Sequence, residues 1–147
     1  MKISVIGTIM RDEIHTLKGE QRESFGGILY NIVALASLTR ATDTIEPICC
    51  IGDEHLNQLK DRYFQSLTQI RLNGLVISPE GTDENVLKYR TGSDRDEQMT
   101  INTPAISKQQ IHAATDSAAI LINIINGQEI TLKQLTRLRE ECKGHSS

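Results

Sequence analysis

The hydrophobic positions along the chain predict alternating strands and helices. Short apolar runs predict buried strands at residues 2–6 and 45–51 and a third central strand at residues 118–124. Apolar residues recur at helical spacing over residues 28–39, a segment apolar on all sides and therefore expected to be buried, and over residues 53–67. Strands that alternate with helices are typical of a parallel sheet, so the sequence predicts an α/β fold.

Two polar segments interrupt this alternation. Residues 13–25, with a turn at Lys18-Gly19, predict an exposed hairpin. Residues 85–91 and 95–101 predict a second hairpin, whose first strand alternates polar and apolar side chains and should have one covered face. We expect segments 13–25 and 85–101 to form a small β lid on a single domain.

The end of the chain predicts two more helices, over residues 107–114 and 131–142. Thr131 suits the N-cap of the second one. Residues 145–147 are expected to be disordered.

Composition excludes several classes of protein. With 38% hydrophobic and 24% charged residues and no apolar run of about 20, the chain is expected to be soluble and not to interact with a membrane. Its start does not match a signal peptide, so a cytoplasmic location is expected. A net charge of −3 with few aromatic residues argues against a nucleic-acid partner. The spacing of cysteine and histidine residues matches no metal site, and Cys49 and Cys50 are expected to be buried, reduced thiols.

Candidate chemistry begins at Gly26-Gly27, which precedes the helix that contains Asn31. Glycines let a ligand approach the main chain closely, and the start of a helix presents free N–H groups. The amide of Asn31 offers a donor and an acceptor, which suits two neighbouring hydroxyls. The alternative is that the glycines only turn the chain into the helix, while Asn31 satisfies a buried carbonyl.

Two aspartates follow predicted strands. Asp12 comes shortly after the first strand, at the sheet edge where α/β folds bind ligands, and its carboxylate can accept bonds from two sugar hydroxyls. The alternative is a solvated loop carboxylate. For Asp53 we prefer a structural role, as a helix N-cap that accepts first-turn N–H bonds.

These features together resemble the ribokinase-like, or PfkB, carbohydrate kinases. The resemblance rests on a strand ending in Gly7 followed by Asp12, on the run Gly26 to Leu38, and on Ile51-Gly52-Asp53. It covers residues 2 to about 140. It implies that Asp12, Gly27 and Asn31 contact a small sugar or nucleoside and that Gly26 shapes the loop. In a complete member it also implies ATP and Mg²⁺.

The resemblance includes only the sugar-binding half of such a kinase. Phosphoryl transfer in this family depends on a glycine-rich loop that ends in a catalytic aspartate, whereas the glycines after Gly92 are only Gly127 and Gly144. We therefore expect residues 1–147 to be one incomplete domain, a partial three-layer sandwich, with no catalytic residue and no bound ATP or Mg²⁺.

Two descriptions of function remain open. The first is a truncated or split carbohydrate kinase that retains its sugar-contacting residues. The second is a non-catalytic interaction or dimerisation module, because an incomplete parallel sheet has an open edge. In either case we expect self-association or a complementing carboxyl-terminal half.

Overall fold

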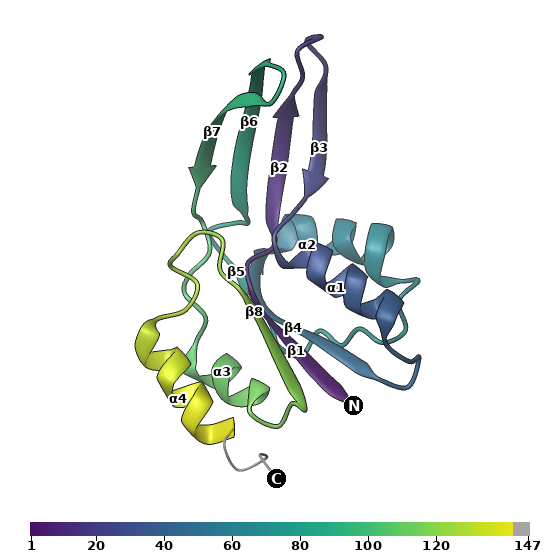
Figure 1. Ribbon diagram of the computed structural model, residues 1–147, viewed down its shortest axis with the longest axis vertical. Coiled ribbons are helices and arrows are strands. Elements are labelled where there is room, and N and C mark those ends of the chain that lie inside the picture. The colour runs from purple at the N-terminus through teal and green to yellow at the C-terminus, as the bar shows by residue number, and fades with distance from the viewer. Residues whose placement is uncertain (143–147) are drawn as a thin grey trace.

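The computed structural model describes residues 1–142, so the disorder expected for residues 145–147 lies outside the described part. A main sheet of four strands runs through the molecule in the order β5-β4-β1-β8, and each neighbouring pair is parallel (Figure 1). This arrangement confirms the predicted α/β class. The strands are β1 (Lys2–Gly7), β4 (Thr44–Gly52), β5 (Leu75–Ser78) and β8 (Ala119–Asn123).

Helices cover both faces of the main sheet. On one face lie α1 (Ile28–Leu38) and α2 (Asp53–Leu59), the latter continued by the π-helical turn η1 (Lys60–Phe64); on the other lie α3 (Lys108–Ala114) and α4 (Leu132–Cys142) (Figure 1). Successive residues of a strand point to opposite faces, and in β1 the side chain of Val5 joins one apolar cluster while that of Ile6 joins the other. The described residues therefore form three layers around two cores.

A second sheet extends beyond the carboxyl ends of the main strands (Figure 1). Its order is β3-β2-β6-β7, with two antiparallel hairpins joined by parallel pairing of β2 with β6. Both predicted hairpins are present, although their first strands begin earlier than expected. The strands are β2 (Met10–His15), β3 (Gln21–Phe25), β6 (Asp83–Thr91) and β7 (Asp94–Thr100).

Two expectations about the surroundings of these elements are wrong. Helix α1 is not buried on all sides: Ile28 and Ile32 are fully buried, but Tyr30 is 65% exposed and Leu38 82% exposed, because only one stripe of the helix meets the sheet. The apolar run at residues 118–124 predicts a central strand, yet β8 is an edge strand among the described residues, and Ile122 is 38% exposed.

The start of α2 also differs from the prediction. Gly52 is the N-cap, and no side chain caps this helix, so Asp53 does not have the expected capping role. The neighbouring Glu54 instead accepts hydrogen bonds from the backbone N–H and the hydroxyl of Thr82, both at 3.2 Å. The α-helical part ends at Leu59, short of the expected residue 67.

Other local predictions are confirmed. Thr131 caps α4, since its hydroxyl accepts a bond from the N–H of Gln134 at 3.3 Å. Cys49 and Cys50 are buried free thiols, and burial raises the pKa of both. Within residues 1–142, no helix has the length and apolarity needed to cross a bilayer.

Candidate functional site

Asp12 and Gly26 come together where the second sheet joins the main one. Asp12 lies in β2, directly opposite Ser24 of β3, and Gly26 follows the end of β3. The approach is so close that a Cβ placed on Gly26 would lie 2.6 Å from Oδ2 of Asp12 and 3.7 Å from Cε2 of Tyr30. Two of the predicted site residues are thus in contact, and the exposed ring of Tyr30 lies beside them.

Gly27 turns the chain from the second sheet into α1. Its φ of 67° is unfavourable for other residues, and a Cβ there would lie 2.1 Å from the carbonyl oxygen of Thr8. That same oxygen accepts the N–H of Ile28 at 2.9 Å, and the N–H of Gly26 donates to the carbonyl oxygen of Met10 at 2.9 Å. The glycine pair therefore turns the chain into the helix, as the alternative proposes. The N–H groups of Gly26 and Ile28 are already bonded within the protein.

Asn31 faces the carboxyl end of β8. Its Oδ1 accepts a hydrogen bond from Nδ2 of Asn123 at 2.8 Å, and Asn123 pairs with Gly7 at the end of β1. In residues 1–142 the Nδ2 of Asn31 makes no hydrogen bond within the protein, so a donor stays available at this half-buried position. Sequence reasoning missed Asn123, although an asparagine that ends an apolar strand is a recognisable signal.

The inner face of the second sheet continues the site away from α1. Alternation along paired strands places on this face Asp12 and Ile14 of β2, Asn85 and Leu87 of β6, and Glu97 of β7. The opposite face is charged, with ion pairs that join Arg11 to Glu23 and Glu84, and Arg90 to Asp96. The inner face thus combines polar and apolar side chains in the manner of a ligand site.

Burial affects the carboxyl group at the base of this face. The pKa of Asp12 is raised, first because the side chain is partly removed from water and second because the carboxylate of Glu97 lies nearby, while Arg95 acts in the opposite direction. Burial therefore disfavours the ionised form of this carboxyl group.

Asp83 fixes how the two sheets join. This fully buried carboxylate accepts four bonds, from the hydroxyl of Thr8 at 3.1 Å and from three donors at 2.8 Å, which are the N–H groups of Asn102 and Thr103 and the side-chain amide of Asn126. Its donors come from the segments that follow β1, β7 and β8. No local pattern indicates this role, because its partners are up to 75 residues away.

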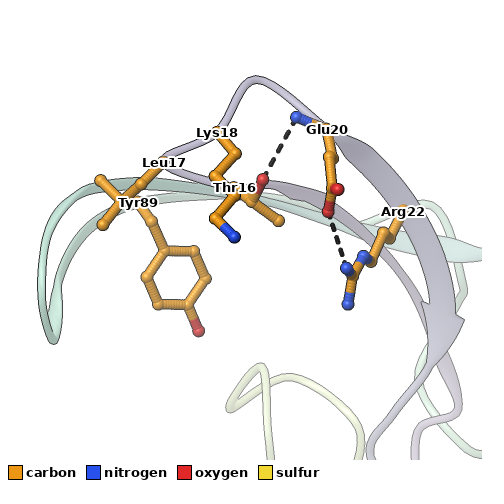
Figure 2. Close-up of a pocket in the computed structure, with 6 residues that line it drawn as sticks. All are labelled: Thr16, Leu17, Lys18, Glu20, Arg22 and Tyr89. Carbon is orange, nitrogen blue, oxygen red and sulfur yellow. Dashed lines mark hydrogen bonds and ion pairs between the residues drawn. The ribbon is translucent and has the colours of Figure 1, made fainter.

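Two pockets lie away from the cluster of predicted residues. A pocket of about 400 Å³ lies near the tip of the second sheet, and Figure 2 shows the ring of Tyr89 projecting from the sheet below Leu17, across the pocket from Arg22. A second pocket, of about 540 Å³, lies between the end of β5 and the segment after β7. Neither of these two pockets is lined by Asp12, Gly26, Gly27 or Asn31.

Comparison with known proteins supports the fold. No protein-family model and no curated protein sequence matches the chain. Among solved structures, a pyrophosphate-dependent kinase in the ribokinase family, in a sulfate complex, superposes with a TM-score of 0.76 at 18% identity over 95% of this chain and 47% of its own. A pyrophosphate-dependent kinase in that family, complexed with a pyrophosphate analog and myo-inositol, superposes with a TM-score of 0.72 at 16% identity. The superposition covers 95% of this chain and 46% of that one.

The fructokinase of Halothermothrix orenii gives a TM-score of 0.70 at 16% identity over 96% of this chain and 54% of its own. The chain thus spans about half the length of the solved structures that it matches. These likenesses show that residues 1–142 have a partial ribokinase-like fold.

Proposed function

We propose that this chain binds a small polyhydroxylated molecule, a sugar or a related polyol, at the surface formed by Asp12, Gly26, Gly27 and Asn31. The observation that carries the proposal is the contact between Asp12 and Gly26, which lie in separate sequence motifs. Nδ2 of Asn31 adds a donor from the first turn of α1. Together they offer a carboxylate acceptor and an amide donor, the groups that vicinal hydroxyls need.

Neighbouring structures support this choice of ligand. One is described as a complex with myo-inositol and another as a fructokinase. Myo-inositol and fructose both carry several hydroxyl groups. At 16% identity the likeness concerns the fold, so the ligand of this chain is inferred from its own residues together with that fold.

We do not propose phosphoryl transfer by this part alone. Among residues 1–142, no three histidine, cysteine or acidic side chains lie together in a way that would hold a metal ion. We derive no step through Mg²⁺ or ATP. In this proposal the chain is the substrate-binding half of a ribokinase-like kinase, and a phosphate donor and a catalytic base would be held elsewhere.

A thermal-shift screen with pentoses, hexoses, cyclitols and nucleosides tests the binding proposal. We expect at least one polyol to raise the melting temperature and Asn31→Ala to remove that rise. Asn57→Ala, which changes an exposed asparagine on α2, is the matched control and should behave like the wild type. A folded protein that no compound stabilises would contradict the proposal.

A second candidate function, an interaction module, is favoured by the edge of the main sheet. Strand β8 has a neighbour only on its β1 side among the described residues. Beside it an apolar groove of about 190 Å³ is lined by residues of β8 and α4, namely Ile120, Ile122, Leu135, Leu138, Arg139 and Cys142. Exposed edges and apolar faces of parallel sheets are normally covered.

We propose that a complementing half of the fold covers this edge, since the matched solved structures contain about as much chain again. Without it, the 147-residue chain should self-associate. Sedimentation velocity should detect oligomers, and Ile122→Glu, which places a charge beside the groove, should reduce them. A cooperatively melting monomer would overturn this second proposal and leave the sugar-binding one intact.

A further inference from the structure

An unpartnered acceptor lies in the second sheet beside Asp12. Asn85 of β6 is only 4% exposed, and its Oδ1 has no hydrogen-bond partner among the described residues. A buried polar atom without a partner is costly, and such atoms are uncommon except where a site requires them. The nitrogen of the same amide is hydrogen-bonded, since Nδ2 donates to Oε1 of Glu97 at 2.7 Å. That bond fixes the amide orientation.

Asn85 occupies the middle of a row of three acidic or amide side chains. It pairs in register with Asp12 of β2 on one side, and on the other it bonds Glu97 of β7. All three lie on the inner face of the second sheet, the face that carries Asp12. The row therefore runs across three adjacent strands, next to the contact between Asp12 and Gly26.

Negative charge dominates this row. Asp12 and Glu97 are both acidic, and the basic group that faces them from β7, Arg95, is partly neutralised because its guanidinium lies 3.5 Å from Oε2 of Glu97. Arg95 also lies over the ring of Tyr89, which holds it toward the tip of the sheet. The row thus presents acceptors and negative potential to a ligand.

We propose that Asn85 and Glu97 form, with Asp12, a specificity subsite that accepts hydroxyl or ammonium donors and excludes anionic ligands such as sugar acids and sugar phosphates. This inference rests on the proposed sugar-binding function and names the class of ligand: neutral polyols or amino sugars. A carboxylate or phosphate placed against this row would meet the two like charges of Asp12 and Glu97, and like-charge repulsion is a means of discrimination between ligands.

Matched ligand series test the subsite. Glucose, galactose and mannose, each with its 2-amino and its uronic-acid form, are titrated into the full chain by thermal shift and calorimetry. The wild type should bind neutral or amino members and should bind the acids at least about tenfold more weakly, as expected for like charges at a partly solvated site. Glu97→Gln should reduce this discrimination, and Asn85→Leu should weaken neutral binding.

Asp96→Asn is the matched control, because it removes a charge from the adjacent residue of β7 on the opposite face. It should leave the discrimination unchanged. The subsite is overturned if the wild type binds uronic acids as tightly as neutral sugars, or if Glu97→Gln and Asn85→Leu both bind as Asp96→Asn does, while Asn31→Ala still abolishes binding. Absence of binding by every member to the folded wild type contradicts the proposed function itself, and the subsite with it.

Discussion

The carboxylate of Asp12 lies so close to Gly26 that the two residues leave no room for a side chain at position 26, where a Cβ would be 2.6 Å from Oδ2. The atom that would be displaced is the end of a side chain and not backbone. Gly26→Ala should therefore fold, with a loss of about 1–2 kcal/mol in the free energy of unfolding. It should weaken polyol binding strongly, because Asp12 must turn away. Urea unfolding and ligand titration of the variant measure the two effects.

Gly27 provides a contrasting case one residue later. A Cβ there meets the backbone carbonyl of Thr8 at 2.1 Å, and the φ of 67° adds strain. We expect Gly27→Ala to cost about 3 kcal/mol or more in the free energy of unfolding, or to prevent folding. The comparison by urea unfolding is decisive: similar stability for the two alanine variants would show that the chain does not turn into α1 in the way described.

Asn31 should affect binding more than stability. Asn31→Ala removes the bond to Asn123, at a cost of about 1 kcal/mol in the free energy of unfolding. Asn123→Ala should cost a similar amount, and it should weaken binding less because Nδ2 of Asn31 remains. Circular dichroism melts with and without ligand distinguish these effects. Equal loss of binding in the two variants would contradict a direct hydrogen bond from Nδ2 of Asn31 to the ligand.

The raised pKa of Asp12 gives a pH dependence with a defined sign. In the unfolded chain this group ionises near the ordinary aspartate pKa of 3.8, and in the folded protein it ionises at higher pH. The unfolded state therefore gains more from ionisation, and the contribution of Asp12 to stability falls as the pH rises from about 3.8 through the folded pKa. Without ligand, Asp12→Asn should stabilise the protein at about pH 7 and have little effect at about pH 3.

Urea unfolding of the wild type and of Asp12→Asn across this pH range measures the difference. Asp94→Asn, an exposed change in β7, serves as the control. A difference between wild type and Asp12→Asn that shrinks as the pH rises would contradict the assigned direction of the pKa shift.

Asp83 should be the carboxylate whose removal costs the most stability. Asp83→Ala leaves four donors without their acceptor at a fully buried position. We expect a loss of about 3–5 kcal/mol in the free energy of unfolding. Hydrogen exchange should also speed up in β6 and in the segment around Asn102. An exchange pattern unchanged in β6 would show that Asp83 does not hold the second sheet in place.

Local patterns predict the parts of the site that depend on neighbouring residues. The strand that ends at Gly7 and the run from Gly26 to Asn31 follow from apolar spacing and glycine punctuation, and the positions of β1 and α1 confirm them. Their meeting with Asp12 is expected from the family resemblance, and the contact at Gly26 is the structural counterpart.

Such local patterns do not predict polar contacts between residues that are distant in the sequence. Asp83 lies just before the predicted hairpin and Asn85 at its first position, and neither polar side chain is expected to be buried from the local sequence, yet both are buried. At Asp53 the pattern of an acidic residue before a helix is misleading, because Gly52 takes the N-cap and Glu54 bonds Thr82. A short side chain at a helix start fits several roles, and the tertiary partner decides among them.

The most direct test of the account is an NMR titration of the ¹⁵N-labelled chain with the polyol that gives the largest thermal shift. The account predicts that the amide signals of Gly26, Gly27 and Asn31 and the side-chain signal of Asn31 move together and saturate with one dissociation constant. Signals that move only around Tyr89 and Leu17 at the tip pocket, with the Gly26 to Asn31 segment unchanged, would contradict it.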